Sequence, residues 1–339
     1  MIVIRCDASD QWGMGNLMRC RALAQALKAE NVKVAMVGPL LKTQQMGDTE
    51  IFEQWFPMTW QNNSIENARQ LLEIAIQLKA RMLVIDDPRA DEDFQKYLYA
   101  AKMKWLQFDG TANKPIWANW ILNALPSADA QTYSQVVRNP SARLFLGPRY
   151  AVLRQEFAST VKKSNSSTDV TTVLMTFGGG DDRGALAWCL KSLQPIINKK
   201  IKLKIISGAT NPHNNNNLKM LEAISNVHIE YFIQPAAPWE IMSECDLAVM
   251  ASGTTVHEVN VFQVPMVLIS LVENQDKPGQ AWAKAVDATY LGDWTKLESD
   301  LLRDSVQAQL QKLHVRKTPP LVDGLGASRI SKVLCEQLN

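Results

Sequence analysis

The sequence lacks a hydrophobic run long enough to cross a bilayer. Its apolar stretches, such as residues 247–251 and 264–268, fall far short of the roughly 20 residues that a spanning helix needs. The chain start shows no basic segment followed by a cleavage-like site, so we expect no signal peptide. An excess of one charge is also missing, because 36 basic and 34 acidic residues give a net charge of +2. We therefore expect a cytoplasmic protein that binds neither nucleic acid nor a membrane, and the balanced charge permits a monomer.

Cysteine and histidine are both scarce. The five cysteines are scattered, and the chain contains no CxxC pair of the kind that indicates a zinc or redox site. We expect reduced thiols that serve in packing. All four histidines lie beyond residue 212, so the first domain has no imidazole for acid–base chemistry.

The composition that remains is that of a globular enzyme-sized chain. With 46% hydrophobic and 21% charged residues, disorder is excluded, and a length of 339 residues favours two domains. Short apolar runs alternate with helical periodicity. The expected strands span 2–6, 32–37, 82–85, 105–108, 170–177, 201–206, 227–232, 247–251 and 266–269. The expected helices include 65–78, 91–101, 183–193, 214–224, 239–245 and 255–262.

The expected elements form two successive arrays. Strands without polar alternation, separated by helices, predict parallel sheets covered on both faces. The polar segment 161–169 interrupts the alternation and suits a linker. We therefore predict an α/β protein with two Rossmann-like domains, 1–160 and 170–339, facing each other across a cleft. The asparagine run 214–217 is expected to be a solvated helix start.

Three strand–loop–helix junctions carry small residues. They are Gly13-Met14-Gly15, Gly178-Gly179-Gly180 and Ser252-Gly253-Thr254-Thr255. Each can present backbone N–H groups at a helix start, where the macrodipole favours an anion, although each alone is also consistent with a tight turn. The first loop lacks the third glycine of GxGxxG, which disfavours a NAD site. Two such loops in the second array favour a diphosphate site.

Polar residues after these loops add to the candidate site. Glu258 can accept hydrogen bonds from ribose hydroxyls or compensate the helix dipole. His257 is expected to be structural or exposed. Asn274 and Gln275 can bind phosphate or sugar hydroxyls, and the alternative for Asn274 is a helix cap.

In this order the motifs resemble those of the UDP-2,4-diacetamido-2,4,6-trideoxy-β-L-altropyranose hydrolases of pseudaminic acid biosynthesis. That family is similar to the bacterial UDP-GlcNAc glycosyltransferase of peptidoglycan synthesis and shares its GT-B fold. The matching segments run through nearly the whole chain. They are residues 5–9, 13–20, 85–86, 147–157, 177–181, 252–258, 273–275 and 323–327.

The resemblance implies hydrolysis of the sugar–UDP bond, with water attacking the anomeric carbon and inverting it. UDP would lie mainly on the second domain, and the first domain would cap the sugar and supply the base. No metal or other cofactor is implied. The implied contacts are Gly178, Gly179, Gly180 and Ser252, Gly253, Thr254, Thr255 for phosphates, Glu258 for ribose, backbone near Ile233 for the uracil edge, and Asn274 and Gln275 for sugar or phosphate. Gly13 and Gly15 belong to the first-domain loop.

The chain departs from the family at one position. The family pattern is Gly-x-Gly-His, and its histidine is the proposed general base, whereas this chain has Asn16. A carboxamide cannot take a proton near neutral pH, although it can orient water or a sugar hydroxyl. Loss of a general base typically costs about 10²–10⁴ in rate. The alternative reading of Asn16 is a helix N-cap.

Three interpretations of Asn16 stay open. The first is an engineered change that traps substrate. The second is a natural enzyme that uses a carboxylate as base, with Asp7, Asp10, Asp86 or Asp87 as candidates. The third is a natural relative that binds the nucleotide sugar with little turnover. Arg19, one turn further on, can face the diphosphate or form an ion pair.

Two rival functions remain beside the hydrolase. A GT-B glycosyltransferase would replace water with an acceptor, and an apolar or basic patch on the first domain would favour it; the sequence contains no clear amphipathic membrane helix. A non-catalytic UDP-sugar-binding protein is favoured only by Asn16.

Overall fold

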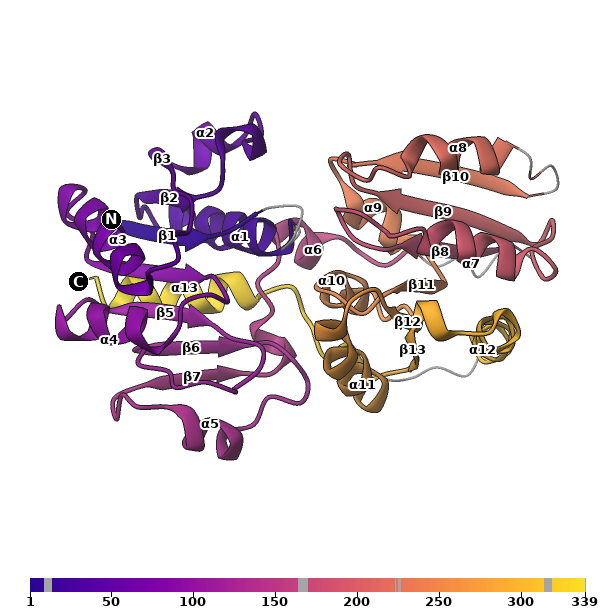
Figure 1. Cartoon of the computed structure of the whole chain (residues 1–339). Coiled ribbons are helices and arrows are strands. Elements are labelled where there is room, and N and C mark those ends of the chain that lie inside the picture. Colours follow the sequence, from indigo (N-terminus) through magenta and orange to yellow (C-terminus); the bar gives the residue numbers. More distant parts are fainter. Residues whose placement is uncertain (9–13, 164–169, 223, 225–226, 314–318, 339) are drawn as a thin grey trace. The chain divides into compact units, whose positions relative to one another are not determined.

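Thirteen strands in two parallel sheets organise the part of the chain that the computed structural model describes, residues 1–8, 14–163, 170–222, 224, 227–313 and 319–338. The chain divides into two compact units (Figure 1). Unit 1 comprises Met1–Gln155 and Gly324–Asn339, and unit 2 comprises Glu156–Asp323. The two expected Rossmann-like arrays are both present.

Unit 1 is built on a seven-stranded parallel sheet with strand order β3-β2-β1-β4-β5-β6-β7. Its elements are β1 (Ile2–Cys6), α1 (Gly15–Ala29), β2 (Val34–Gly38), η1 (Leu41–Thr43), α2 (Asp48–Ile51), β3 (Gln54–Pro57), α3 (Ser64–Gln77), β4 (Met82–Asp86), α4 (Glu92–Ala100), β5 (Trp105–Phe108), β6 (Trp120–Asn123), α5 (Ala130–Val136), β7 (Arg143–Leu146), η2 (Pro148–Tyr150) and α13 (Gly326–Glu336).

Unit 2 is built on a six-stranded parallel sheet with strand order β10-β9-β8-β11-β12-β13. Helix α6 (Gln155–Ser159) spans the boundary between the units. The further elements are β8 (Thr171–Thr176), α7 (Ala185–Leu193), β9 (Ile201–Ser207), α8 (Asn214–Glu222), β10 (His228–Ile233), α9 (Pro238–Ser243), β11 (Leu247–Ala251), α10 (Thr255–Val261), β12 (Met266–Ser270), η3 (Glu273–Gln275), α11 (Asp276–Ala285), β13 (Ala288–Asp293), η4 (Trp294–Lys296) and α12 (Ser299–Gln311).

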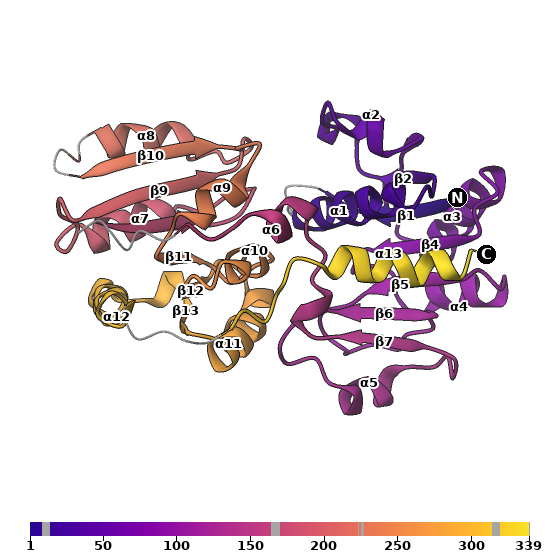
Figure 2. The same cartoon turned by 180° about the vertical axis from the view of Figure 1, so that it is seen from behind.

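Burial on both faces of the sheets explains why the strands read as unbroken apolar runs. In β1, Ile2 and Ile4 belong to the core that packs on α1, whereas Val3 belongs to the core beneath α3 and α4. Since successive side chains of a strand point to opposite faces, helices on both sides leave no face for polar alternation. Figure 2 shows the helices of unit 1 on either side of its sheet.

The C-terminal helix corrects the expected domain boundaries. Residues 324–339 were expected in the second domain, but α13 packs against α1, and Ile330 and Leu334 are buried in the unit 1 core (Figures 1 and 2). Gly326 makes this docking close, because a Cβ there would lie 2.1 Å from the carbonyl oxygen of Ala151. The first boundary also moves, since residues 156–160 group with unit 2. Most of the expected linker, residues 164–169, lies outside the described residues.

Several elements were absent from the sequence-based expectation. Strands β3, β6, β7 and β13 were not expected; β3 ends in a proline, and β7 and β13 are not fully buried apolar runs. Helices α12 and α13 do carry buried apolar residues at helical spacing, for example Leu302 and Val306. Their existence was therefore readable from sequence.

Candidate functional site

Each sheet has one topological switch point, and the candidate motifs lie at both. In unit 1 the strand order reverses direction between β1 and β4, and in unit 2 it reverses between β8 and β11. Open α/β sheets bind ligands outside the carboxyl ends of the strands at such points, because the two following loops run in opposite directions there. Asp7 and Asp87 follow β1 and β4, whereas Gly178 and Ser252 follow β8 and β11.

Charged side chains fill the carboxyl edge of unit 1 between β1 and β4. Asp87 is fully buried, and Arg89 holds it with two contacts, Nε to Oδ1 at 2.9 Å and Nη2 to Oδ2 at 2.7 Å. Arg5 Nη2 lies 3.1 Å from the same Oδ2. Burial lowers the pKa of Arg5, and the Asp87 charge opposes that effect. Breaking a buried pair of this kind is costly, so Asp87 is committed to its two cations and is not accessible as a base.

Asp7 occupies the outer side of the same cluster. Its Oδ2 lies 2.6 Å from Arg89 Nη2, and its side chain is 19% exposed. Asp7 and Asp87 come one residue after Cys6 and Asp86, which are paired in the β1–β4 register. The two carboxylates are thus neighbours, but only Asp7 reaches the surface.

Arg19 and Asp86 form the second ion pair at this edge. Nε and Nη2 of Arg19 each lie 2.5 Å from an oxygen of the buried Asp86 carboxylate. Burial acts to lower the pKa of Arg19, but the Asp86 charge and hydrogen bonds outweigh it and raise the pKa above its ordinary value. The ion-pair alternative for Arg19 is therefore the observed arrangement. Because Arg19 remains partly exposed, it can still meet an anion.

Asn16 does not cap helix α1. The helix begins at Gly15 with Met14 in the N-cap position, so Asn16 is its second residue. Its side-chain Nδ2 donates to the backbone carbonyl of Asp86 over a long 3.4 Å. This contact places Asn16 at the β1–β4 switch point, beside the Arg19–Asp86 pair. Gly13 and Asp10 lie outside the described residues.

Asp109 follows β5, and its carboxylate accepts hydrogen bonds from neighbouring parts of the chain. Tyr133 donates its hydroxyl to Asp109 Oδ2 at 2.6 Å, and the backbone N–H of Ala112 donates to the same oxygen at 2.7 Å. Asp109 therefore shapes the turn after β5.

In unit 2 the loop after β11 meets the segment after β12. Ser252 is buried, and its hydroxyl donates to the backbone carbonyl of Gln275 at 2.9 Å. The Gln275 side chain accepts from the Leu271 N–H, and a Cβ on Gly253 would lie 3.5 Å from Gln275 Nε2. The structure thus brings together two motifs that are more than 20 residues apart in sequence. The side-chain amide of Gln275 therefore lies beside Gly253, two residues before α10 begins.

The remaining residues of this loop face outward to different degrees. Thr254 is exposed, and Thr255 and Glu258 are half-buried in the first turns of α10. Asn274 is exposed in η3 and is not the N-cap of α11, which is Gln275. Ile233 is 45% exposed at the carboxyl end of the edge strand β10. His257 contacts the Thr254 carbonyl through Nδ1 at 3.0 Å and packs edge-on against Trp282, in line with a structural role.

The loop of Gly178, Gly179 and Gly180 differs from a simple helix-start cradle. Four residues separate it from α7, whose N-cap is Gly184. Gly178 has a φ of +98°, which favours glycine, and Gly179 approaches the next loop so closely that a Cβ on Gly208 would lie 1.9 Å from its carbonyl oxygen. The loops after β8 and β9 therefore form one packed unit.

Buried asparagines support this pair of loops. The run 214–217 begins α8 as expected, but only Asn215 and Asn216 are exposed, whereas Asn214 and Asn217 are buried. Asn217 is 1% exposed, and its amide and that of Asn211 donate to Asp182 Oδ2 at 3.2 and 2.8 Å. Asp182 Oδ1 accepts from the Gly184 N–H at 2.7 Å. Asp181, Asp182 and His213 have ligand atoms within 4.8 Å of one another. Both Asp182 oxygens nevertheless accept hydrogen bonds, from Gly184 and from the two asparagines. The cluster is therefore better suited to supporting the loops than to binding a metal.

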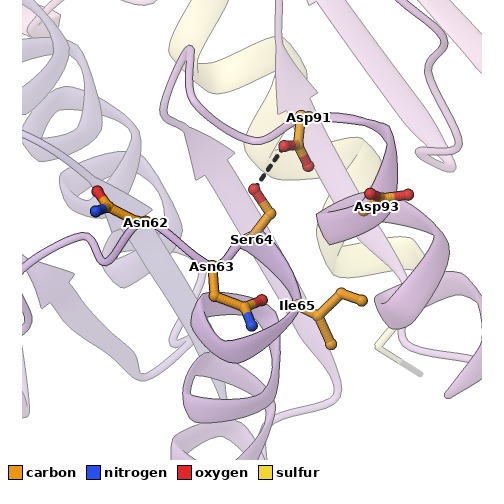
Figure 3. Close-up of a pocket in the computed structure, with 6 residues that line it drawn as sticks. All are labelled: Asn62, Asn63, Ser64, Ile65, Asp91 and Asp93. Carbon is orange, nitrogen blue, oxygen red and sulfur yellow. Dashed lines mark hydrogen bonds between the residues drawn. The ribbon is translucent and has the colours of Figure 1, made fainter.

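A surface depression of about 470 Å³ lies where helices α3 and α4 begin (Figure 3). Ser64 donates to Asp91 across it at 2.5 Å, and Asn63 and Asp91 cap the two helices. With two aspartates in its lining, Asp91 and Asp93, the depression is unsuited to a diphosphate.

Sequence reasoning missed Arg89, Arg5 and Asp182. Arg89 stands two residues after Asp87 in an Asp-Asp-Pro-Arg run, and Arg5 stands two before Asp7. An arginine close to an aspartate in sequence is common and does not predict an ion pair. Only the fold shows that Arg5 and Arg89 contact Asp87.

The chain resembles known proteins in sequence and in structure. Residues 155–275 match the family model of lipid-A-disaccharide synthetase. The chain is 25% identical over 301 residues to an uncharacterized protein of Methanocaldococcus jannaschii, covering 86% of this chain and 60% of that protein. It is 22% identical over 339 residues to the spore coat polysaccharide biosynthesis protein SpsG of Bacillus subtilis, covering 98% of this chain and 96% of SpsG.

Solved structures share the whole fold. MnaA of S. aureus in complex with UDP has a TM-score of 0.68 at 13% identity, with 100% of this chain and 97% of that chain covered. MurG of Acinetobacter baumannii has a TM-score of 0.63 at 13% identity, with 99% of each chain covered. The UDP-GlcNAc 2-epimerase of Neisseria meningitidis bound to UDP-GlcNAc has a TM-score of 0.64 at 12% identity, covering 99% of this chain and 100% of that chain. The chain therefore has the GT-B fold, which confirms the predicted fold class.

A search of the described residues finds no helix with the length and apolar character needed to cross a membrane.

Proposed function

We propose that this protein binds a UDP-sugar and hydrolyses its sugar–UDP bond, with UDP-2,4-diacetamido-2,4,6-trideoxy-β-L-altropyranose of pseudaminic acid biosynthesis as substrate. The observation that carries the proposal is the convergence of Gln275 on the Ser252–Gly253 loop at the carboxyl ends of β11 and β12. Backbone N–H groups and a neutral amide gathered there suit a diphosphate better than a second protein surface.

UDP would bind unit 2 in this proposal. The exposed Thr254 and the half-buried Thr255 offer hydroxyl and backbone donors to phosphate, and Glu258 lies one turn further along α10 for the ribose. The Gly178–Gly180 loop adds donors from the neighbouring switch-point strand. Backbone near Ile233 would read the uracil edge, and the exposed Asn274 would reach the sugar or the β-phosphate.

The sugar would bind unit 1, with Asp7 as the proton acceptor. Asp86 and Asp87 are buried in ion pairs with Arg19 and with Arg5 and Arg89, whereas Asp7 is partly exposed at the same edge. A water oxygen attacks the anomeric carbon, and the bond from that carbon to the β-phosphate oxygen breaks. UDP leaves with the electron pair, and Asp7 takes the water proton. Asn16 would orient the water.

Incubation of the purified protein with the UDP-sugar tests the proposal. We expect UDP release without any added acceptor, and ¹H NMR should show the inverted anomer as the first sugar product. Asp7→Asn should lower kcat by about 10²–10⁴ and leave UDP affinity within about threefold. Calorimetry that detects no UDP binding at millimolar nucleotide would contradict the proposal.

An exposed apolar segment favours a second candidate, a glycosyltransferase with an apolar acceptor. Leu40, Leu41 and Met46 lie between β2 and β3 of unit 1, and Met46 is 94% exposed. Exposed apolar side chains gathered on one connection suit a lipid-linked acceptor or a membrane surface. UDP release that depends on a lipid-linked acceptor, and that falls in Leu41→Glu, would select this function over hydrolysis.

A further inference from the structure

One guanidinium joins the carboxylates that follow two neighbouring strands. Arg89 Nη2 lies 2.6 Å from Asp7 Oδ2 and 2.7 Å from Asp87 Oδ2, while its Nε lies 2.9 Å from Asp87 Oδ1. The Arg89 N–H also donates to Asp87 Oδ1 at 3.1 Å. The backbone N–H and the side chain of Arg89 therefore both hold the Asp87 carboxylate after β4, and Nη2 also contacts Asp7.

Aromatic packing holds the guanidinium in place. The Arg89 Cζ lies 4.8 Å from the centre of the Trp60 ring, and the Arg5 Cζ lies 5.3 Å from the same ring. Trp60 in turn stacks on Phe94 at 5.3 Å. A cation on an aromatic face is stabilised by the ring quadrupole, so the Trp60 ring stabilises both guanidinium groups.

The cluster of Arg5, Asp7, Asp87 and Arg89 has one buried pair and one partly exposed pair. The Asp87 and Arg5 side chains are 0% and 1% exposed, whereas those of Asp7 and Arg89 are 19% and 26% exposed. The charged groups that face Asp7 among the described residues are Arg89 and, behind it, Asp87 and Arg5. The buried pair cannot touch a ligand, but it determines where Arg89 holds Asp7.

We propose that Arg89 is a positioning residue that fixes the Asp7 carboxylate at the β1–β4 switch point, an inference that rests on the proposed role of Asp7 as proton acceptor. The planar fork of arginine is essential to this role, because it contacts Asp87 through two nitrogens while it reaches Asp7. The ammonium of lysine is a point charge that can approach one carboxylate closely but cannot span both in this way. A positive charge at position 89 is therefore insufficient to position Asp7 without the guanidinium geometry.

Arg89→Ala and Arg89→Lys test the inference through UDP release. A misplacement of about 1 Å can cost about 10²-fold, so we expect kcat to fall about 10²-fold in Arg89→Ala, with KM changed less than about threefold. Arg89→Lys should recover less than about a tenth of the lost rate. Millimolar ethylguanidinium, which can stack on Trp60, should raise the Arg89→Ala rate at least about tenfold, whereas ethylammonium should not.

Arg69→Ala is the matched control, because Arg69 is an exposed arginine on α3 paired only with Glu66 and Glu73 in the contacts described. It should keep the wild-type rate and show no response to ethylguanidinium. Equal kcat in wild type and Arg89→Ala, or a loss that ethylguanidinium and ethylammonium restore equally, would overturn the inference. Arg89→Lys serves if the alanine variant does not fold, and an unchanged kcat in it would also overturn the inference.

Crystal structures separate this inference from the proposed function. Wild-type protein that releases no UDP contradicts the proposed function. The inference is then decided by the Asp7 side chain in Arg89→Ala: a carboxylate displaced by about 1 Å or more supports it, and one in the wild-type place overturns it.

Discussion

The Ser252 hydroxyl donates to the Gln275 backbone carbonyl at 2.9 Å, and this bond ties the loop after β11 to the segment after β12. Ser252 is buried, so its hydroxyl positions the loop, and in the proposed function Gly253 and Thr254 would contact the phosphates. The loop geometry is therefore set before any ligand arrives.

Gly253→Ala should weaken UDP binding at least about tenfold without unfolding the protein. The added Cβ would meet Gln275 Nε2 at 3.5 Å, an ordinary contact, so the melting temperature should change little. A phosphate that approaches the backbone would, however, meet the methyl group. Calorimetry with UDP measures the affinity. Gly110→Ala, with nothing within 4 Å of its Cβ, is the control, and unchanged UDP affinity in Gly253→Ala would place the phosphates elsewhere.

In an Asp7→Asn background, where the proposed base is missing, Asn16→His should raise UDP release at least about tenfold, the low end of a general base's contribution. The residue lies beside the Arg19–Asp86 pair at the β1–β4 switch point, where an imidazole could accept the water proton. Steady-state rates on the UDP-sugar measure the effect, and Asn62→His on an exposed loop is the control. Equal rates for Asp7→Asn with and without Asn16→His would defeat the prediction.

Gly326→Ala should destabilise unit 1 by about 1–3 kcal/mol, the usual cost of overpacking. The new Cβ would lie 2.1 Å from the Ala151 carbonyl oxygen, and neither backbone segment can yield without moving α13 off the core. Urea unfolding measures the loss, again with Gly110→Ala as reference. A free energy of unfolding equal to that of the wild type would show that α13 docks more loosely than described.

Alkaline pH should destabilise unit 2 through Tyr290. Burial and the nearby Asp276 carboxylate raise the pKa of Tyr290 to about 12 from 10.0, because its hydroxyl donates to Asp276 at 2.7 Å. The unfolded state therefore loses the proton first, and this contribution is complete below pH 10 and lost as pH rises toward 12.

Tyr290→Phe should accordingly show a smaller loss of unfolding free energy between pH 9 and about 11 than the wild type. Urea titrations at both pH values measure the difference. Tyr99→Phe, at an exposed ring on α4, should behave as wild type. An identical pH dependence in Tyr290→Phe and wild type would contradict the assignment.

The sequence predicted nine of the thirteen strands that the structure describes and most helices of the two arrays, because these signals are local. A run such as residues 247–251 is apolar at every position, and the strand β11 observed there, Leu247–Ala251, is buried on both faces. The loops at the carboxyl ends were found for the same reason, since small and polar residues follow directly after such runs. Strands β7 and β13 were not predicted because neither is a fully buried apolar run.

The candidate site was predictable as a set of loops but not as a set of partners. Sequence alone left Asp7, Asp10, Asp86 and Asp87 as candidates for the base. Burial distinguishes the three that the structure describes, because Asp86 and Asp87 are buried in their arginine pairs, whereas Asp7, which also pairs with Arg89, is partly exposed. The Asn211–Asp182–Asn217 support of the glycine loop was equally hidden, since a run of asparagines is polar whether buried or exposed.

By itself, then, the sequence determined the alternation of strands and helices, the two-array organisation and the loops at the strand ends, since each depends on neighbours within a few residues. Only the tertiary structure decided that α13 packs on unit 1, which carboxylate stays accessible, and that Arg89 bridges Asp7 and Asp87. Those features depend on contacts between residues that the chain brings together from distant positions, and the local pattern around each residue is the same whichever partner it meets.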